Sequence, residues 1–288
     1  MEPDEFRDIV ERHKKYLKGD DEAKYDCATF RGDLANLNFR GLNLQQAEFV
    51  FTNLENVDLS AANLSNCNFR GAHIEGAKLA NADLSHADLS CAVLESYNFD
   101  DIEAKGLLAL RRKYYPVCLA GANLEYAILT GANLNLCKMQ SANLHGAELT
   151  DANLICADLR HADLTEVSIL PGHIKLSSTD LTNANLSGID LSRNNLQGNN
   201  FNQANLSGAN LSHSVLCSSS LRFANLTNVN FSKADLYGAN FSFADLSGAN
   251  FDGANLVDTV PSNLNQAYDG LPTFDLESDK IKGVCLLR

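Results

Sequence analysis

The sequence predicts an all-β solenoid, in which short extended segments wind around one axis and stack coil upon coil. A large apolar residue recurs every five positions over most of the 288 residues. A small residue, most often Ala, precedes it by two positions, and Asp or Asn mostly fills the slot between them. The unit is A-(D/N)-(L/F)-x-x, and it is best formed from Asn240 to Leu256.

A period of five matches neither an amphipathic helix, whose period is 3.6, nor a continuous strand, whose period is 2. It matches three-residue extended segments that are each followed by a corner. Within a unit the small and the large residue are two apart, so both point to the same side. Two residues in five are then buried along a continuous axis, and each coil contacts only its neighbours.

Residues 1–26 are predicted to be an N-terminal capping helix and a linker. Over residues 4–18 apolar and aromatic residues fall on one helical face, and Asp4 precedes them as a candidate N-cap. Gly19 follows three lysines and suits the position just past the helix end. The residues of the apolar face are Phe6, Ile9, Val10, His13, Tyr16 and Leu17.

Residues 27–259 are predicted to form the solenoid, with forty-two large residues in three runs between 34 and 256. The pattern is lost at 100–116, where a loop or helical insertion is expected. Because large residues resume twenty positions after Phe99, a degenerate coil is the alternative there. A step of seven from Ile169 to Leu176 shifts the phase at 170–175.

Residues 260–288 lose the repeat and are predicted to be an irregular C-terminal cap. A short helix is expected from Ser262 to Tyr268, and apolar residues at 284–287 suggest a packed or pairing strand. The last coil presents an open strand edge, which is a candidate surface for a homodimer at the C-terminal end. Capping within one chain is the alternative.

The stretches ANLSGANLSHSVL and ADLSGANFDGANL resemble the motif of the pentapeptide-repeat proteins. The resemblance covers about 34–256, and the N-terminal helix also resembles leaders found in bacterial members. It implies a right-handed quadrilateral β-helix with four pentapeptides in each coil of twenty residues. The forty-two units would then make about ten to eleven coils.

Composition and motifs argue against several functional classes. A formal net charge of −13 does not suit a nucleic-acid binder, which needs a basic face. No apolar run is long enough to span a membrane and no signal peptide is recognisable, so a cytoplasmic protein is expected. A filled, convex rod without catalytic, cofactor or metal-binding motifs predicts a protein that is not an enzyme. The eight cysteines lack CxxC spacing and are expected to be free thiols.

The favoured function is a scaffold that binds an unidentified protein partner through its outer faces and the 100–116 segment. The resemblance also implies a DNA-mimicking inhibitor or protector of DNA gyrase or topoisomerase IV as an alternative. A mimic needs dense acidic columns, yet residues 171–256 carry five acids against four bases. A secreted bacterial effector is a further alternative, although the sequence shows no export signal.

Three groups of residues are candidates for protein binding. Phe223 and Phe243 lie twenty apart and should stack on the surface beside Arg222, a combination typical of interface anchors. A second outward apolar group has scattered surface residues as its alternative; its members are Leu136, Ile155 and Cys156. The third is the basic and aromatic cluster of the interruption, a candidate site for an acidic partner with a solvated loop as its alternative; it contains Arg111, Arg112, Lys113, Tyr114 and Tyr115.

Overall fold

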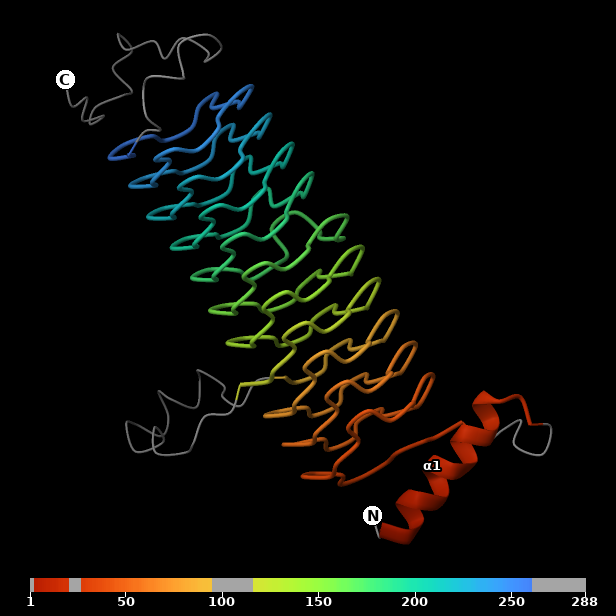
Figure 1. The fold of residues 1–288 in the computed structure, drawn as a ribbon. Coiled ribbons are helices and arrows are strands. Elements are labelled where there is room, and N and C mark those ends of the chain that lie inside the picture. The colour runs from red at the N-terminus through yellow and green to blue at the C-terminus, as the bar shows by residue number, and fades with distance from the viewer. Residues whose placement is uncertain (1–2, 21–26, 95–115, 261–288) are drawn as a thin grey trace, which may run out of the picture.

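The computed structural model describes residues 3–20, 27–94 and 116–260. Coils stack into a long rod, and helix α1 lies at the N-terminal end (Figure 1). Parallel bridges join residues twenty apart, such as Asn63 to Asp83 and Asn205 to Asn225. Each coil therefore holds four five-residue units, and the predicted β-solenoid is confirmed.

Each unit consists of a three-residue side and a two-residue corner. We call the side positions the small, polar and large slots, and the next two the first and second corner slots. The N–H of large Leu64 donates to the Asp83 carbonyl at 2.7 Å, and the N–H of polar Asn63 donates to the Leu42 carbonyl at 2.9 Å. Because the sides are so short, the coils of the described residues contain isolated bridges rather than longer strands.

Small and large slots fill the core, as the alternation predicts. Leu84, Leu144 and Leu206 are fully buried in large slots, and Ala87 and Ala147 in small slots. The first coil departs from the rule, since its small slots hold bulky Leu37 and Leu42, which are only partly buried against the core. Burial of two residues per unit, repeated coil after coil, is the main stabilising term of the rod.

The second corner slot has a positive φ from Asn36, at 65°, to Asp258, at 56°. The turn is closed by a hydrogen bond from the residue three positions on, as in Ala62 N–H to the Leu59 carbonyl at 3.1 Å. A left-handed residue at this point favours glycine. Within the repeats Gly accordingly occurs at second corner slots, for example Gly188 and Gly208, and Ser is common at first corner slots.

The preference for Asp or Asn in the polar slot has a direct cause in the turn. The Oδ1 atom of Asp83 accepts the N–H of Ser85, two residues on, at 3.1 Å, which is the geometry of an Asx turn. Asn adds a second bond, because its Nδ2 donates to the residue one coil back. Asn143 donates in this way to Asn123 at 3.1 Å, and Asn205 to Asn185 at 3.0 Å.

The coils on either side of the first interruption pair directly with each other. Lys78 bridges Cys118 and Val93 bridges Asn133, both forty residues apart. The twenty additional residues therefore contribute no coil to the stack between these two. Residues 95–115 themselves, with most of the 100–116 segment, lie outside the described residues, as does the predicted C-terminal cap beyond Val260.

The second interruption adds two residues at one corner. Glu148 bridges Ser168 at a spacing of twenty, whereas Asp158 bridges Asp180 at a spacing of twenty-two. A spacing of twenty returns between Asp180 and Asn200. The enlarged corner leaves Leu170 exposed, and the core residues just before it, Val167 and Ile169, are only partly buried.

Helix α1 spans Pro3–Leu17, close to the predicted 4–18. Asp4 is not its N-cap, because the helix already begins at Pro3, whose missing N–H suits the first turn. The predicted role of Gly19 is confirmed: its φ is 72°, and Asp20 N–H bonds the Lys15 carbonyl at 3.2 Å. The helix covers the first coil through Phe6, whose ring meets that of Phe39 edge-on at 4.9 Å.

Replacing residues 95–116 by the dipeptide Ser-Gly should leave the solenoid folded. Leu94 occupies a large slot and Val117 a small slot, both fully buried, so a two-residue corner is all that the geometry needs between them. Circular dichroism and hydrogen exchange of the neighbouring coils should match those of the full chain. A single Ser in place of 95–116 is the control, since it is too short for the corner. Loss of protection in both variants alike would contradict the prediction.

Candidate protein-binding surface

Phe223 and Phe243 form a stacked pair on one edge of the rod, as the twenty-residue spacing predicts. Their ring centroids are 4.7 Å apart with an interplanar angle of 4°. Each side chain is 50% exposed. The guanidinium carbon of Arg222 lies 5.5 Å from the Phe223 ring centroid, within range of a cation–π interaction. We call Arg222, Phe223 and Phe243 the aromatic corner.

Both phenylalanines occupy second corner slots and have left-handed backbones, with φ of 59° and 63°. A bulky residue in this conformation costs roughly 1–2 kcal/mol. Their mutual stacking contributes about 0.5–1.5 kcal/mol in return, which does not offset two such costs. Strain kept at an exposed site is a reason to look for a function there.

The polar surroundings hold Arg222 in place without neutralising it. The Oδ1 atom of Asn202 accepts the Arg222 backbone N–H at 3.0 Å and the Ser220 hydroxyl at 2.6 Å. Within the described parts of the chain, Arg222 forms no ion pair. Its positive charge is therefore available beside an apolar surface.

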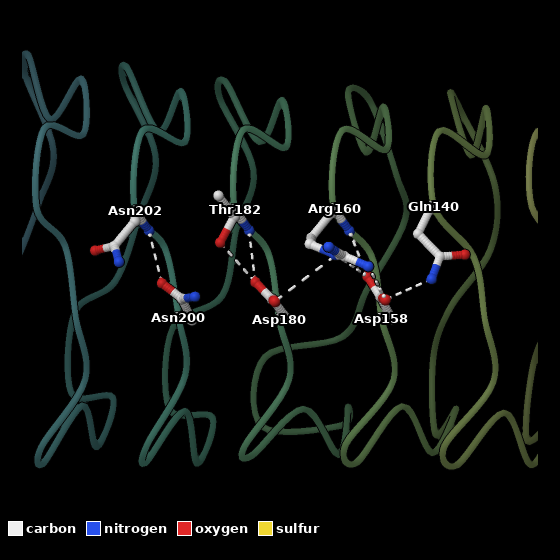
Figure 2. Close-up of polar contacts among 7 residues, drawn as sticks. All are labelled: Gln140, Asp158, Arg160, Asp180, Thr182, Asn200 and Asn202. Atoms are coloured by element: carbon white, nitrogen blue, oxygen red, sulfur yellow. Dashed lines mark hydrogen bonds and ion pairs between the residues drawn. The ribbon is translucent and has the colours of Figure 1, made fainter.

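Arg160 lies in a polar ladder on the same side of the rod, where, unlike Arg222, it is paired with acidic side chains (Figure 2). Arg160 donates two hydrogen bonds to Asp158, at 2.8 and 2.7 Å, and lies 3.9 Å from Asp180. Burial acts to raise the pKa of Asp158, but hydrogen bonds from Arg160 and Gln140 outweigh it and lower that pKa. The charge of Arg160 is thus satisfied within the chain, in contrast to that of Arg222.

The other predicted groups are less informative. Leu136 and Ile155 are half-buried, and Cys156 beside them is exposed. The basic and aromatic cluster at 111–115 lies outside the described residues.

Cys67 is buried in a small slot, where desolvation raises the pKa of its thiol, and its Sγ lies 3.0 Å from the Leu44 carbonyl.

Three exposed aromatic side chains were not singled out by the sequence, namely Phe51, Tyr126 and Tyr237. Phe51 and Tyr126 occupy second corner slots, with φ of 53° and 55°, and each lies over a glycine of the next coil. Phe51 has no aromatic residue twenty positions away, and Tyr126 stacks on His86, which lies forty positions away across the first interruption. A search for stacked pairs at a spacing of twenty therefore passes over both. A search for any bulky residue in a second corner slot finds both.

Neither a metal centre nor a membrane helix is found in the parts of the chain that the structure describes. No group of three or more His, Cys, Asp or Glu side chains among residues 3–20, 27–94 and 116–260 is arranged to hold a metal ion. Over the same residues, no helix is long and apolar enough to cross a membrane.

Comparison with known proteins agrees with the repeat architecture. The family model described as pentapeptide repeats matches eight copies, and together they span most of the chain. The matched residues are 31–60, 67–101, 118–154, 140–169, 174–212 and 219–258. No curated protein sequence matches the chain.

The solved structures that resemble the chain include pentapeptide-repeat proteins and a quinolone-resistance protein. HetL, involved in heterocyst differentiation regulation in the cyanobacterium Nostoc, is 27% identical over 81% of this chain and 90% of its own, with a TM-score of 0.37. QnrB1, a plasmid-mediated fluoroquinolone resistance protein, is 18% identical over 82% of this chain and 84% of its own, with a TM-score of 0.36. A protein of the Arabidopsis thaliana thylakoid lumen is 28% identical over 40% of this chain and 68% of its own, with a TM-score of 0.18.

Proposed function

The chain belongs to the pentapeptide-repeat family, and we propose that it is a non-enzymatic scaffold that binds another protein through the aromatic corner. The observation that carries this proposal is the strained, half-exposed pair of Phe223 and Phe243 beside an unneutralised Arg222. Aromatic residues and arginine are the side chains most enriched at the energetic centres of interfaces. The free cysteines of the described residues support a site of action in the reducing cytoplasm.

The charge pattern gives less support to DNA mimicry. Lys78 bridges Asp58 in the preceding coil, so a positive residue lies directly beside an acidic one on this face. The Asn ladders occupy polar slots where a mimic would need Asp, as at Asn205 and Asn225. Duplex DNA carries one negative charge per about 1.7 Å of its axis. A gyrase supercoiling assay that showed inhibition at micromolar protein would favour the mimic instead.

The double variant Phe223→Gly/Phe243→Gly tests the proposal without endangering the fold. Glycine removes both rings and suits the left-handed backbone, so the stability of the rod should change by no more than about 1 kcal/mol. Affinity capture from a lysate of the source organism should then lose the proteins that the natural chain retains. Arg222→Ser should weaken the same interactions, because it removes the charge and keeps the rings.

The matched control is Asn183→Gly/Gln203→Gly, at the second corner slots of the two preceding coils on the same edge. It makes the same backbone change without removing an aromatic ring, and its captured proteins should be those of the natural chain. Identical captured proteins for the natural chain and the Phe223→Gly/Phe243→Gly variant would refute the proposal. The Ser-Gly replacement of 95–116, run in parallel, measures the separate contribution of that segment.

A further inference from the structure

Phe51 is the most exposed large apolar side chain of the described residues, at 74%. It occupies a second corner slot with a φ of 53°, the same strained position that Phe223 and Phe243 hold elsewhere. It lies near the N-terminal end of the rod, and its edge of the rod differs from that of the aromatic corner. The exposure and backbone strain of Phe51 are therefore independent of those of the aromatic corner.

The ring of Phe51 lies against the next coil. A Cβ at Gly71 would clash with Cε1 of Phe51, so the ring lies directly over the glycine corner. The Phe51 N–H also donates to the Arg70 carbonyl at 3.1 Å. A ring that is already positioned loses little freedom when a partner covers it, which favours binding.

Two arginines lie on the coils either side of Phe51. Arg70 directly precedes Gly71. On the other side the Asn53 N–H donates to the Gly32 carbonyl and the Thr52 hydroxyl to the Phe30 carbonyl, both at 2.9 Å. Arg31 therefore runs alongside Thr52, next to Phe51. Both arginines are exposed, and neither forms an ion pair with a described residue.

The neighbouring acids do not neutralise these arginines by contact. Asp33 accepts hydrogen bonds from the Ala35 N–H and the Asn53 side chain, both at 3.0 Å. Asp88 accepts the Ser90 N–H at 2.8 Å and the Ser90 hydroxyl. Glu48 is partly buried in the polar slot of the unit that contains Phe51. The coils on either side of Phe51 thus each carry an exposed arginine that forms no ion pair with a described residue.

We propose that Arg31, Phe51 and Arg70 form a second anchor site, which binds a protein segment carrying a large apolar side chain flanked by carboxylates. Complementary charge selects acidic segments, and the ring supplies the apolar contact. Since the two sites lie on different edges and near opposite ends, the rod holds two segments at once. Binding at the Phe51 site does not depend on whether the aromatic corner binds a partner.

The test uses the full chain with Phe223→Gly/Phe243→Gly, so that only the Phe51 site remains. The probe is a fluorescein-labelled peptide, Glu-Asp-Glu-Phe-Glu-Asp-Glu, followed by fluorescence anisotropy at 50 mM salt. Binding should weaken at least tenfold with Phe51→Gly, and similarly with Arg31→Ser/Arg70→Ser. Gly71→Ala should also weaken it, because it displaces the ring but keeps the ring and both charges.

Two further peptides define specificity: one with Ser for Phe, and one with Lys for every acidic residue. Both should bind at least tenfold more weakly than the probe. Equal affinity of the probe for the natural Phe51 and the Phe51→Gly chain would overturn the proposal, as would equal binding of the Lys peptide. Stronger Phe51-dependent binding to anionic phosphatidylserine vesicles than to the peptide would show a membrane site instead.

Discussion

Phe49→Ala should lower the free energy of unfolding of the N-terminal coils by about 4 kcal/mol. Phe49 is fully buried in a large slot between two other phenylalanines. Its ring stacks on Phe30 at 4.8 Å and on Phe69 at 4.7 Å, with interplanar angles of 8° and 1°. Removing the middle ring leaves a cavity in a close-packed column, and neither neighbour has a second core layer behind it to collapse inward.

The loss should stay local, because each coil contacts only its neighbours. Hydrogen exchange measured by mass spectrometry should show lost protection for residues 30–79 and unchanged protection for residues 200–240. Phe49→Leu is the matched control, since Leu89 and Leu129 fill the same core column further along. Phe49→Leu should lower the free energy of unfolding clearly less than Phe49→Ala does. Equal loss of protection at both ends of the rod would contradict the nearest-neighbour description.

Most of the fold can be predicted from the five-residue period, because that period reflects which residues are buried. Most residues that point inward in a coil are apolar and fit a narrow core, so Leu144 or Ala147 can be assigned from the sequence alone. The exceptions are small slots that bury a polar residue, such as Asn194 and Ser219. The step of twenty between coils follows from four such units. Register across the seven-residue step at Leu170 is also recoverable, since the two extra residues fall at a corner and the twenty-residue spacing returns beyond it.

The surface is harder to predict from the sequence, because side chains there are selected by local hydrogen bonds rather than by burial. The left-handed backbone of the second corner slot appears in the sequence only as a preference for Gly or Asn. Without that conformation, Phe51 reads as one more scattered surface residue. With it, the residue is strained and exposed, and therefore informative. The unneutralised state of Arg222 likewise depends on contacts that spacing alone does not give.

The contact between α1 and the first coil depends on a histidine that must stay neutral. His13 is fully buried, and its Nδ1 accepts the backbone N–H of Ala28 at 3.0 Å. Its ring stacks on Tyr16 at a centroid distance of 5.7 Å. An imidazolium has no acceptor nitrogen, so protonation would break the bond to Ala28 and bury a charge.

Burial lowers the pKa of His13 below its ordinary value in the docked state. Once α1 detaches, the side chain returns to a pKa of about 6.5. The detached form therefore binds a proton first as the pH falls. Docking of α1 should be fully stable above about pH 6.5, weaken as the pH falls below that value, and level off once the docked histidine is also protonated.

Hydrogen exchange of residues 3–20 and 27–39 between pH 5 and 7.5, corrected for intrinsic rates, should show this loss of protection in the natural chain. His13→Asn should abolish the pH dependence, because Asn places an acceptor oxygen near the position of Nδ1 and does not titrate. His13→Leu should destabilise the contact by about 1–3 kcal/mol at every pH, since it leaves the Ala28 N–H unsatisfied. Other titratable groups near this contact are Tyr16, Cys27 and Glu48. If the natural chain and His13→Asn lost protection over the same pH range, one of these groups, rather than His13, would control docking.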